Sequence, residues 1–143
     1  MNDFVFKLKN TVLEFKPKNE SKQEGAFPGY YSYEEAMELF GKPDKDGWRL
    51  PTKEELAFLV KKYKYRYEGG NGIFDDRLVI PACGYVHRLT DSPIMENRGF
   101  YLTASPADIG DLISLMVFDF KKSRLSYDFP KNSYPVRLVR ERN

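Results

Sequence analysis

Two helix-start signals lie close together in the first half of the chain. The segments 32–35 (Ser-Tyr-Glu-Glu) and 52–55 (Thr-Lys-Glu-Glu) each have the capping-box form, in which a hydroxyl and a glutamate satisfy backbone N–H groups. Apolar residues follow at helical spacing, namely Tyr33, Ala36, Met37 and Phe40 after the first box and Leu56, Leu59, Val60 and Tyr63 after the second. Gly41 and Pro43 then end the first helix. The sequence therefore predicts two short amphipathic helices, each of which needs a surface for its apolar face.

Short β-prone runs separated by turns make up most of the remaining chain. They cover residues 4–8, 11–15, 78–86, 100–104, 112–118, 125–127 and 136–140. Lys9 and Asn10 form a predicted hairpin turn, whereas the glycine-rich segment 69–72 breaks the chain before the later strands. Because the helices precede a series of strands, the order predicts an α+β fold with two short helices packed on a twisted antiparallel sheet. We expect the N-terminal strand to pair near the C-terminal one.

The length of the chain, 143 residues, is the usual size of one domain. We therefore predict a single domain over 1–143, with an N-terminal strand region (1–15), a loop rich in Lys, Glu, Ser, Pro and Gly (16–29) and a core (30–143). Hydrophobic residues make up 41% of the chain and the mean hydropathy is −0.59, which is typical of a soluble globular protein.

Two further patterns concern membranes and export. The chain contains no apolar run of the ~18 residues that a membrane span requires. Its first residues lack the basic start and apolar stretch of a secretory signal. We therefore expect no membrane span and a cytoplasmic or virion-associated location.

Charge and the scarcity of two residue types exclude several chemistries. Lys and Arg number 23 against 21 for Asp and Glu, and a net charge of +2 does not favour nucleic acid as a partner. One cysteine, Cys83, and one histidine, His87, cannot build a Cys₄ or Cys₂His₂ zinc site. In an extended strand these two residues lie about 13 Å apart, too far for a thiolate–imidazole pair. We therefore predict no catalytic residue, no metal and no cofactor.

The segment 61–67 (Lys-Lys-Tyr-Lys-Tyr-Arg-Tyr) alternates cations with tyrosines. Such a composition suits single-stranded nucleic acid, but the segment begins in the last turn of the predicted second helix, where Lys complements the helix dipole. We interpret it as a helix end that runs into an exposed strand or loop. A surface contact with an acidic partner is the alternative.

The segment 47–56 (Gly-Trp-Arg-Leu-Pro-Thr-Lys-Glu-Glu-Leu) has a mechanical role at the start of the second helix. Pro51 presets the backbone for the helix, Thr52 accepts the N3 amide hydrogen, and Glu55 reaches back to the cap. We expect Trp48 to bury against the helix and Arg49 to pair with a carboxylate at this junction. These five residues are interpreted as a fold signature rather than as a binding site.

The same segment resembles the "WRLPT-x-EEL" signature of bacterial C-type-lectin-like domains, in particular the Fibrobacter succinogenes major paralogous domain family. These domains are related to the sulfatase-modifying (formylglycine-generating) enzyme fold. Further blocks agree in order between about residues 29 and 142, namely 33–36 (YEEA), 80–85 (IPACGY), 99–105 (GFYLTAS) and 134–140 (YPVRLVR). The resemblance implies a C-type-lectin-like fold that displays loops for binding, although a fold does not fix a function.

Departures from the family pattern restrict what the resemblance implies. The formylglycine-generating branch relies on a pair of cysteines, whereas Cys83 is the single cysteine here and Leu138 stands where a cysteine is frequent. The Glu-Pro-Asn, Gln-Pro-Asp and Trp-Asn-Asp triplets of calcium-dependent sugar-binding lectins are also absent from the sequence. Neither the oxidase chemistry nor calcium-mediated sugar binding is therefore implied.

Polar loops between the predicted strands are the expected binding surface, because loops on a rigid scaffold commonly carry binding residues. The segments 86–98 and 119–133 are the main candidates, and the residues proposed to bind a ligand are Tyr85, His87, Arg88, Asp91, Tyr127 and Asp128. We predict a non-enzymatic recognition or structural module of bacterial or phage origin that binds a protein or a glycan. The alternatives are an enzyme distantly related to the formylglycine-generating group, dependent on His87 or Cys83, and a subunit of a larger homo- or hetero-oligomeric assembly.

Overall fold

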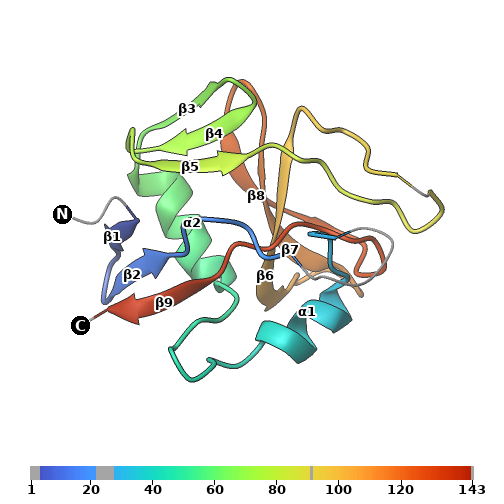
Figure 1. The fold of residues 1–143 in the computed structure, drawn as a ribbon, viewed down its shortest axis with the longest axis horizontal. Coiled ribbons are helices and arrows are strands. Elements are labelled where there is room, and N and C mark those ends of the chain that lie inside the picture. Colours follow the sequence, from blue (N-terminus) through green and yellow to red (C-terminus); the bar gives the residue numbers. More distant parts are fainter. Residues whose placement is uncertain (1–3, 22–27, 91, 143) are drawn as a thin grey trace.

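The computed structural model describes residues 4–21, 28–90 and 92–142 (Figure 1). Its elements within these ranges are β1 (Val5–Lys7), β2 (Val12–Phe15), α1 (Tyr33–Phe40), α2 (Lys53–Lys62), β3 (Tyr65–Glu68), β4 (Asn71–Phe74), β5 (Leu78–Pro81), β6 (Gly99–Pro106), β7 (Ile113–Phe118), β8 (Ser123–Asp128) and β9 (Val139–Arg142). The described part of the chain is therefore mostly β structure with two short helices.

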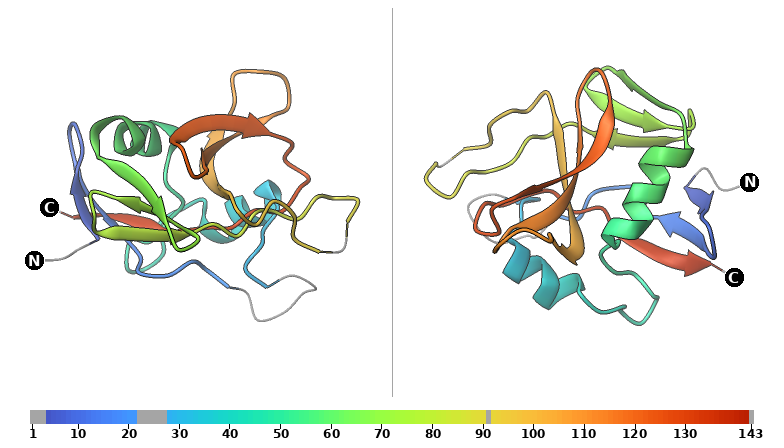
Figure 2. Two further views of the ribbon diagram at one scale, coloured as in Figure 1. Left: turned by 90° about the horizontal axis from the view of Figure 1, so that it is seen from above. Right: turned by 180° about the vertical axis from the view of Figure 1, so that it is seen from behind.

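The strands form three small antiparallel sheets, in the orders β1-β2-β9, β3-β4-β5 and β6-β7-β8. All three sheets meet at α2, as Figure 2 shows from two sides. The shared core contains Leu56 and Leu59 of α2 together with Phe15, Phe74 and Phe118, which come from one sheet each. A second core on the other side of the β6-β7-β8 sheet includes residues of α1 and of the segment 134–138.

The predicted fold class is wrong: the structure is not an α+β fold with one twisted antiparallel sheet, and it does not show a C-type-lectin-like arrangement. The strands divide into three sheets because other parts of the chain occupy the edges that would join them. At the edge of β6, the Leu102 N–H donates to the carbonyl of Pro135, and a proline has no N–H with which to continue a ladder. At the edge of β9, Val139 exchanges both backbone hydrogen bonds with Arg49.

The predicted helix starts, the first hairpin turn and the pairing of the terminal strands agree with the structure, unlike the predicted fold class. Both helices begin where the capping boxes place them, and Ser32 and Thr52 each accept the amide hydrogen of the residue three positions later. The first hairpin turns at Lys9 and Asn10, since the Leu8 N–H donates to the Thr11 carbonyl. β2 pairs with β9, which confirms the predicted pairing of the N-terminal and C-terminal strands.

Gly69 and Gly70 of the glycine-rich segment 69–72 form a hairpin turn, and Asn71 and Gly72 already belong to β4, so the segment does not separate two regions. Gly69 and Gly70 have φ values of +61° and +81°, and such left-handed residues reverse the chain tightly in a two-residue hairpin. β3 and β4 flank this turn and pair along their whole length. The predicted strand 78–86 ends early, at Pro81, and the predicted strand 136–140 begins regular pairing only at Val139.

Candidate functional site

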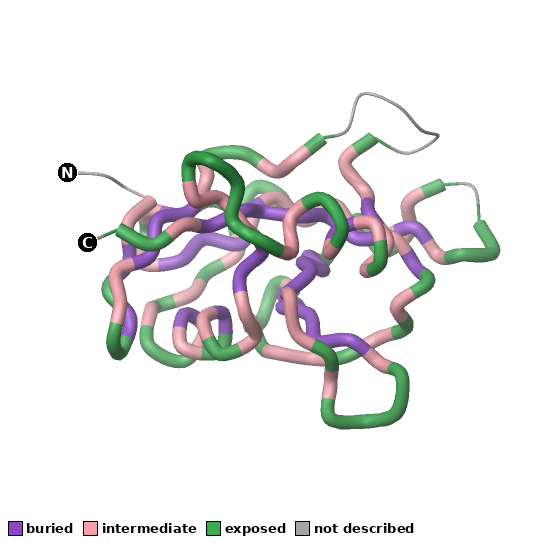
Figure 3. Tube along the Cα trace, turned by 90° about the horizontal axis from the view of Figure 1, so that it is seen from below, coloured by how far each residue is buried: buried purple, intermediate pink, exposed green. Residues whose placement is uncertain are grey.

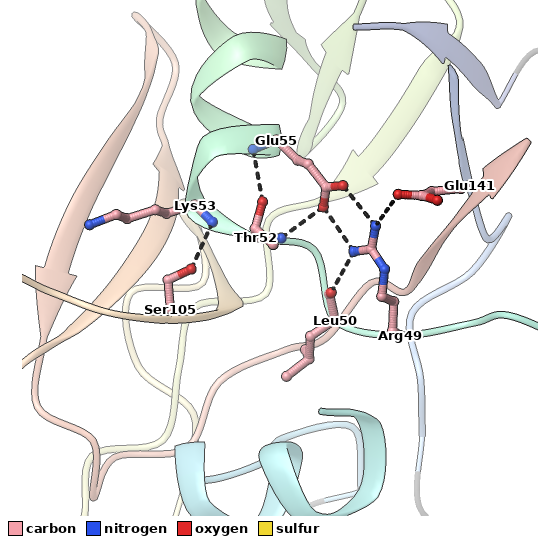
Figure 4. Close-up of polar contacts among 7 residues, drawn as sticks. All are labelled: Arg49, Leu50, Thr52, Lys53, Glu55, Ser105 and Glu141. Atoms are coloured by element: carbon pink, nitrogen blue, oxygen red, sulfur yellow. Dashed lines mark hydrogen bonds and ion pairs between the residues drawn. The ribbon is translucent and has the colours of Figure 1, made fainter. Parts of the chain in front are cut away.

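The predicted fold signature forms a network of polar contacts at the start of α2 (Figure 4). The guanidinium of Arg49 donates to both carboxylate oxygens of Glu55, with Nη1–Oε1 and Nη2–Oε2 distances of 2.9 and 2.7 Å. Glu55 Oε1 also accepts the Thr52 N–H, and Thr52 Oγ1 accepts the Glu55 N–H, which completes the capping box. Arg49 further donates to the Leu50 carbonyl, and its Nη2 lies 3.7 Å from Glu141. The expected Arg49–carboxylate pair is therefore present.

This network lowers the pKa of the Glu55 carboxyl group. Burial alone raises the pKa of Glu55, but the bonds from Arg49 and from the Thr52 backbone outweigh it, so the pKa lies below its ordinary value. The bonds to Glu55 in turn raise the pKa of Arg49. Both groups therefore stay charged near neutral pH. Their hydrogen bonds hold the segment before α2 to the first turn of the helix.

Trp48 and Pro51 also act within the fold. The Trp48 ring is half-buried against the second core, and the Arg140 guanidinium lies 4.4 Å from its centroid. The Pro51 carbonyl accepts the Ala104 N–H, which attaches the start of α2 to β6. The residues of the signature therefore join α2, β6 and the β9 region.

The predicted binding segment 119–133 is not one loop, because it contains the turn 119–122 and the strand β8. Only its last residues, 129–133, lie beside the loop that begins at Val86, at the end of the molecule away from the chain termini (Figure 2). Val86 and Ser133 exchange two backbone hydrogen bonds of 2.8 Å, and the Arg88 N–H donates to the Asn132 side chain. Much of the exposed chain at this end belongs to the projecting loops (Figure 3). We call the surface formed by residues 86–90, 92–98, 107–112 and 127–133 the loop end.

The proposed ligand-binding residues occupy different positions at the loop end. Tyr85 is half-buried and stacks on Tyr134, with ring centroids 5.6 Å apart. Burial first, and then the nearby charge of Asp128, raise the pKa of Tyr85. The Asp128 carboxylate accepts the Phe129 N–H. Tyr85 and Asp128 are therefore both only partly exposed at the loop end.

The other proposed residues that the structure describes, His87, Arg88 and Tyr127, lie in three different environments. His87 stabilises a turn, because its Nδ1 accepts the Leu89 N–H at 3.1 Å. Arg88 is exposed and lines a hollow of about 170 Å³. Tyr127 is 52% exposed but lines a different hollow, of about 240 Å³, beside Lys53. Asp91 lies outside the described residues.

The sequence interpretation missed the exposed apolar side chains of the loop end. Leu89, Ile109 and Phe129 are 76%, 50% and 59% exposed. Phe129 lines the same hollow as Arg88, with Lys131 and Asp111, whereas Ile109 lines the hollow beside Tyr127. In the sequence these residues look like ordinary strand or turn positions, so only their exposure in the structure identifies them.

Cys83 belongs to a separate polar cluster inside the molecule. Its Sγ lies 3.9 Å from the hydroxyl of Tyr101, which also accepts from Asn19. Arg137 is only 4% exposed, and its Nε donates to the side-chain oxygen Oδ1 of Asn19 at 2.8 Å. Burial raises the pKa of the Cys83 thiol. The cysteine is therefore a protonated thiol held among structural contacts, and His87 makes its contacts within its own loop.

Among the described residues, no three His, Cys, Asp or Glu side chains gather where they would hold a metal ion. Neither described helix has the length and apolar character needed to cross a membrane. Compared with known proteins, the chain matches no family model, no curated protein and no solved structure.

Proposed function

We propose that this protein is a recognition module that binds a protein partner through the loop end. The observation that carries the proposal is the group of exposed apolar side chains there, Leu89, Ile109, Tyr127 and Phe129. Arg88 and Lys131 lie beside Phe129, and Lys53 lies beside Tyr127. Aromatic and aliphatic anchors next to arginine are typical of the centres of protein interfaces.

The dimensions of the hollows favour a macromolecule over a small ligand. The two hollows of the loop end have volumes of about 170 and 240 Å³, below the ~300–1,000 Å³ of pockets that enclose a small molecule. The surface of a partner protein can instead cover the exposed apolar side chains that line the two hollows. The absence of catalysis stays a prediction.

The test uses the tagged protein as bait in an extract of its source cells, followed by measured binding of each purified candidate partner. Leu89→Ala and Phe129→Ala should each weaken binding by about tenfold or more, because truncating a central anchor costs about 2 kcal/mol. Phe120→Ala is the matched control, since Phe120 is 70% exposed but lies at the opposite end of β8, outside the loop end.

Two results would contradict the proposal. One is a partner whose affinity changes equally with Phe120→Ala and Phe129→Ala. The other is binding of a glycan on an array that Leu89→Ala and Phe129→Ala abolish, since this result would assign the loop end to sugars.

A further inference from the structure

β8 lies at the edge of its sheet and directs part of its backbone outward. The turn that joins it to β7 is closed by a 3.0 Å hydrogen bond from the Asp119 N–H to the Lys122 carbonyl, so these two residues face one another. In an antiparallel ladder, alternate residues direct their backbone groups toward the neighbouring strand and away from it. The residues of β8 whose N–H and C=O groups point away from β7 are therefore Ser123, Leu125 and Tyr127. Within the described part of the chain, no hydrogen bond reaches these groups.

Most other sheet edges are covered. At β1, the carbonyl of Val5 accepts from Arg77 and that of Lys7 accepts from Tyr63. At β5, the carbonyls of Val79 and Pro81 accept from Arg137 and Tyr101. The edges of β6 and β9 bond to Pro135 and Arg49. Among the described residues, two edges lack such contacts, β3 with four residues and β8 with six, and β8 is the longer.

We infer that β8 is the interface between two copies of this chain, paired edge to edge as antiparallel strands around a two-fold axis. The axis passes beside Leu125, so that Leu125 faces Leu125 of the second copy and Ser123 faces Tyr127. The two β6-β7-β8 sheets then join into one sheet of six strands. A two-fold axis requires the same patch on both copies, and a strand edge meets this condition when it is self-complementary.

The charges along β8 favour this register. Lys122 precedes Leu125 by three residues and Asp128 follows it by three, so each Lys122 faces Asp128 of the second copy, twice in the dimer. Residues opposite one another have side chains on the same face of the sheet, and opposite charges there attract. Arg124 is exposed and lies diagonal to the same carboxylate. A parallel arrangement, or a shift along the edge, separates these charges.

The inferred interface shares Tyr127 and Asp128 with the loop end, but the inference stands without the proposed function. Arg88 and Leu89 of the loop end lie outside β8 and outside the paired edges. Two six-residue edges bury less than the ~1,600 Å² of a standard interface. The dimer should therefore be weak, with a dissociation constant in the micromolar to millimolar range.

The first test measures self-association of the full chain by sedimentation equilibrium across that concentration range. Tyr127→Pro removes an outward N–H without breaking a bond to β7, a substitution that edge strands tolerate. It should weaken dimerisation by about tenfold or more. Tyr127→Ala, the matched control, keeps the N–H and should weaken dimerisation less. Leu89→Ala should leave dimerisation unchanged, which distinguishes this interface from the proposed binding of a protein partner.

The second test uses charge reversal. In a dimer of the Lys122→Asp variant, each new aspartate faces Asp128 of the second copy; in a dimer of the Asp128→Lys variant, each new lysine faces Lys122. Like charges then meet at both places, so each variant should be monomeric. Mixed together, the two variants have opposite charges at both positions and should form a heterodimer, which native mass spectrometry detects by mass. Equal unfolding midpoints of the variants and the wild type show that each is folded.

Three results would overturn the inference. These are a wild-type chain that stays monomeric at every concentration, a dimer that Tyr127→Pro and Lys122→Asp do not weaken, and open-ended association instead of a closed dimer. Restored pairing in the mixture, with Tyr127→Pro monomeric and Tyr127→Ala still dimeric, supports it.

Discussion

Glu55 should contribute more to stability than any other single residue of the network at the start of α2. Replacing it with alanine removes both bonds from Arg49 and the acceptor of the Thr52 N–H. The Arg49 side chain is 16% exposed, so its charge loses its close partner and keeps Glu141 at 3.7 Å and the Leu50 carbonyl. Breaking a buried pair in this way costs about 3–5 kcal/mol, and we expect about 3 kcal/mol because Glu141 remains.

A series of variants separates the ion pair from the helix cap. Thr52→Ala removes only the hydroxyl of the capping box and should cost about 1 kcal/mol. Glu55→Gln keeps an oxygen for the Thr52 N–H but loses the charge, and should cost about 2 kcal/mol. In a double-mutant cycle, Arg49→Met and Glu55→Ala should show a coupling of about 2 kcal/mol.

Urea unfolding at neutral pH, followed by circular dichroism, gives the free energy of unfolding of each variant. The reasoning is refuted if Thr52→Ala costs as much as Glu55→Ala, or if the coupling is below about 0.5 kcal/mol, which is the size of an exposed pair.

The pKa of Glu55 gives the same network a pH dependence. Because the folded-state pKa lies below the ordinary 4.5, the stabilisation is fully present above about pH 4.5 and is lost as the pH falls through the lowered value. Glu14 has a lowered pKa as well: burial raises it, but bonds from Arg140 and Arg142 outweigh that effect. Glu55→Gln should therefore reduce the loss of unfolding free energy at acid pH without removing it, because Glu14 still contributes.

Three further predictions concern packing and the buried polar cluster. Gly99→Ala should cost about 1–3 kcal/mol in urea unfolding, since its new methyl group would lie 2.1 Å from the Phe118 ring; an unchanged midpoint would contradict this packing. Cys83 should react with a thiol reagent about tenfold more slowly in the folded protein than in urea, because burial raises its pKa; equal rates would show that it is freely accessible. Arg137→Met should cost about 2–3 kcal/mol, whereas Arg124→Met at an exposed position should change stability by less than about 0.5 kcal/mol; similar costs would refute the burial argument.

The helices were predictable because their signals are local. A capping box and an apolar stripe lie within a dozen residues, and Thr52 and Glu55 make the contacts that their spacing predicts. The Lys9-Asn10 turn is local in the same way. Arg137 illustrates the opposite case, because its bond to Asn19 spans 118 positions and no sequence pattern connects the two residues.

The candidate site was predictable in its location but not in its composition. Polar residues predict loops at 86–98 and 119–133, but the second segment contains β8, and the Val86–Ser133 pairing brings only its end beside the first. Choosing residues by polarity also selects Tyr85, which is half-buried and stacks on Tyr134. It passed over Phe129, which is 59% exposed. An apolar residue is exposed only when no other segment covers it, and that depends on the whole fold.

The division into three sheets and the choice of β8 as an interface have one physical origin. A sheet grows until its edge groups are satisfied in another way, and an unsatisfied edge tends to pair with another chain. Arg49, Arg77 and Arg137 satisfy edge groups of β9, β1 and β5, each reaching across from a distant part of the sequence. These contacts end the sheets and prevent a single continuous sheet from forming. β8 has no such contact among the described residues; Lys122 directly precedes it and Asp128 is its last residue. Of the two edges left open among the described residues, β3 and β8, the longer one therefore has charges suited to a second copy.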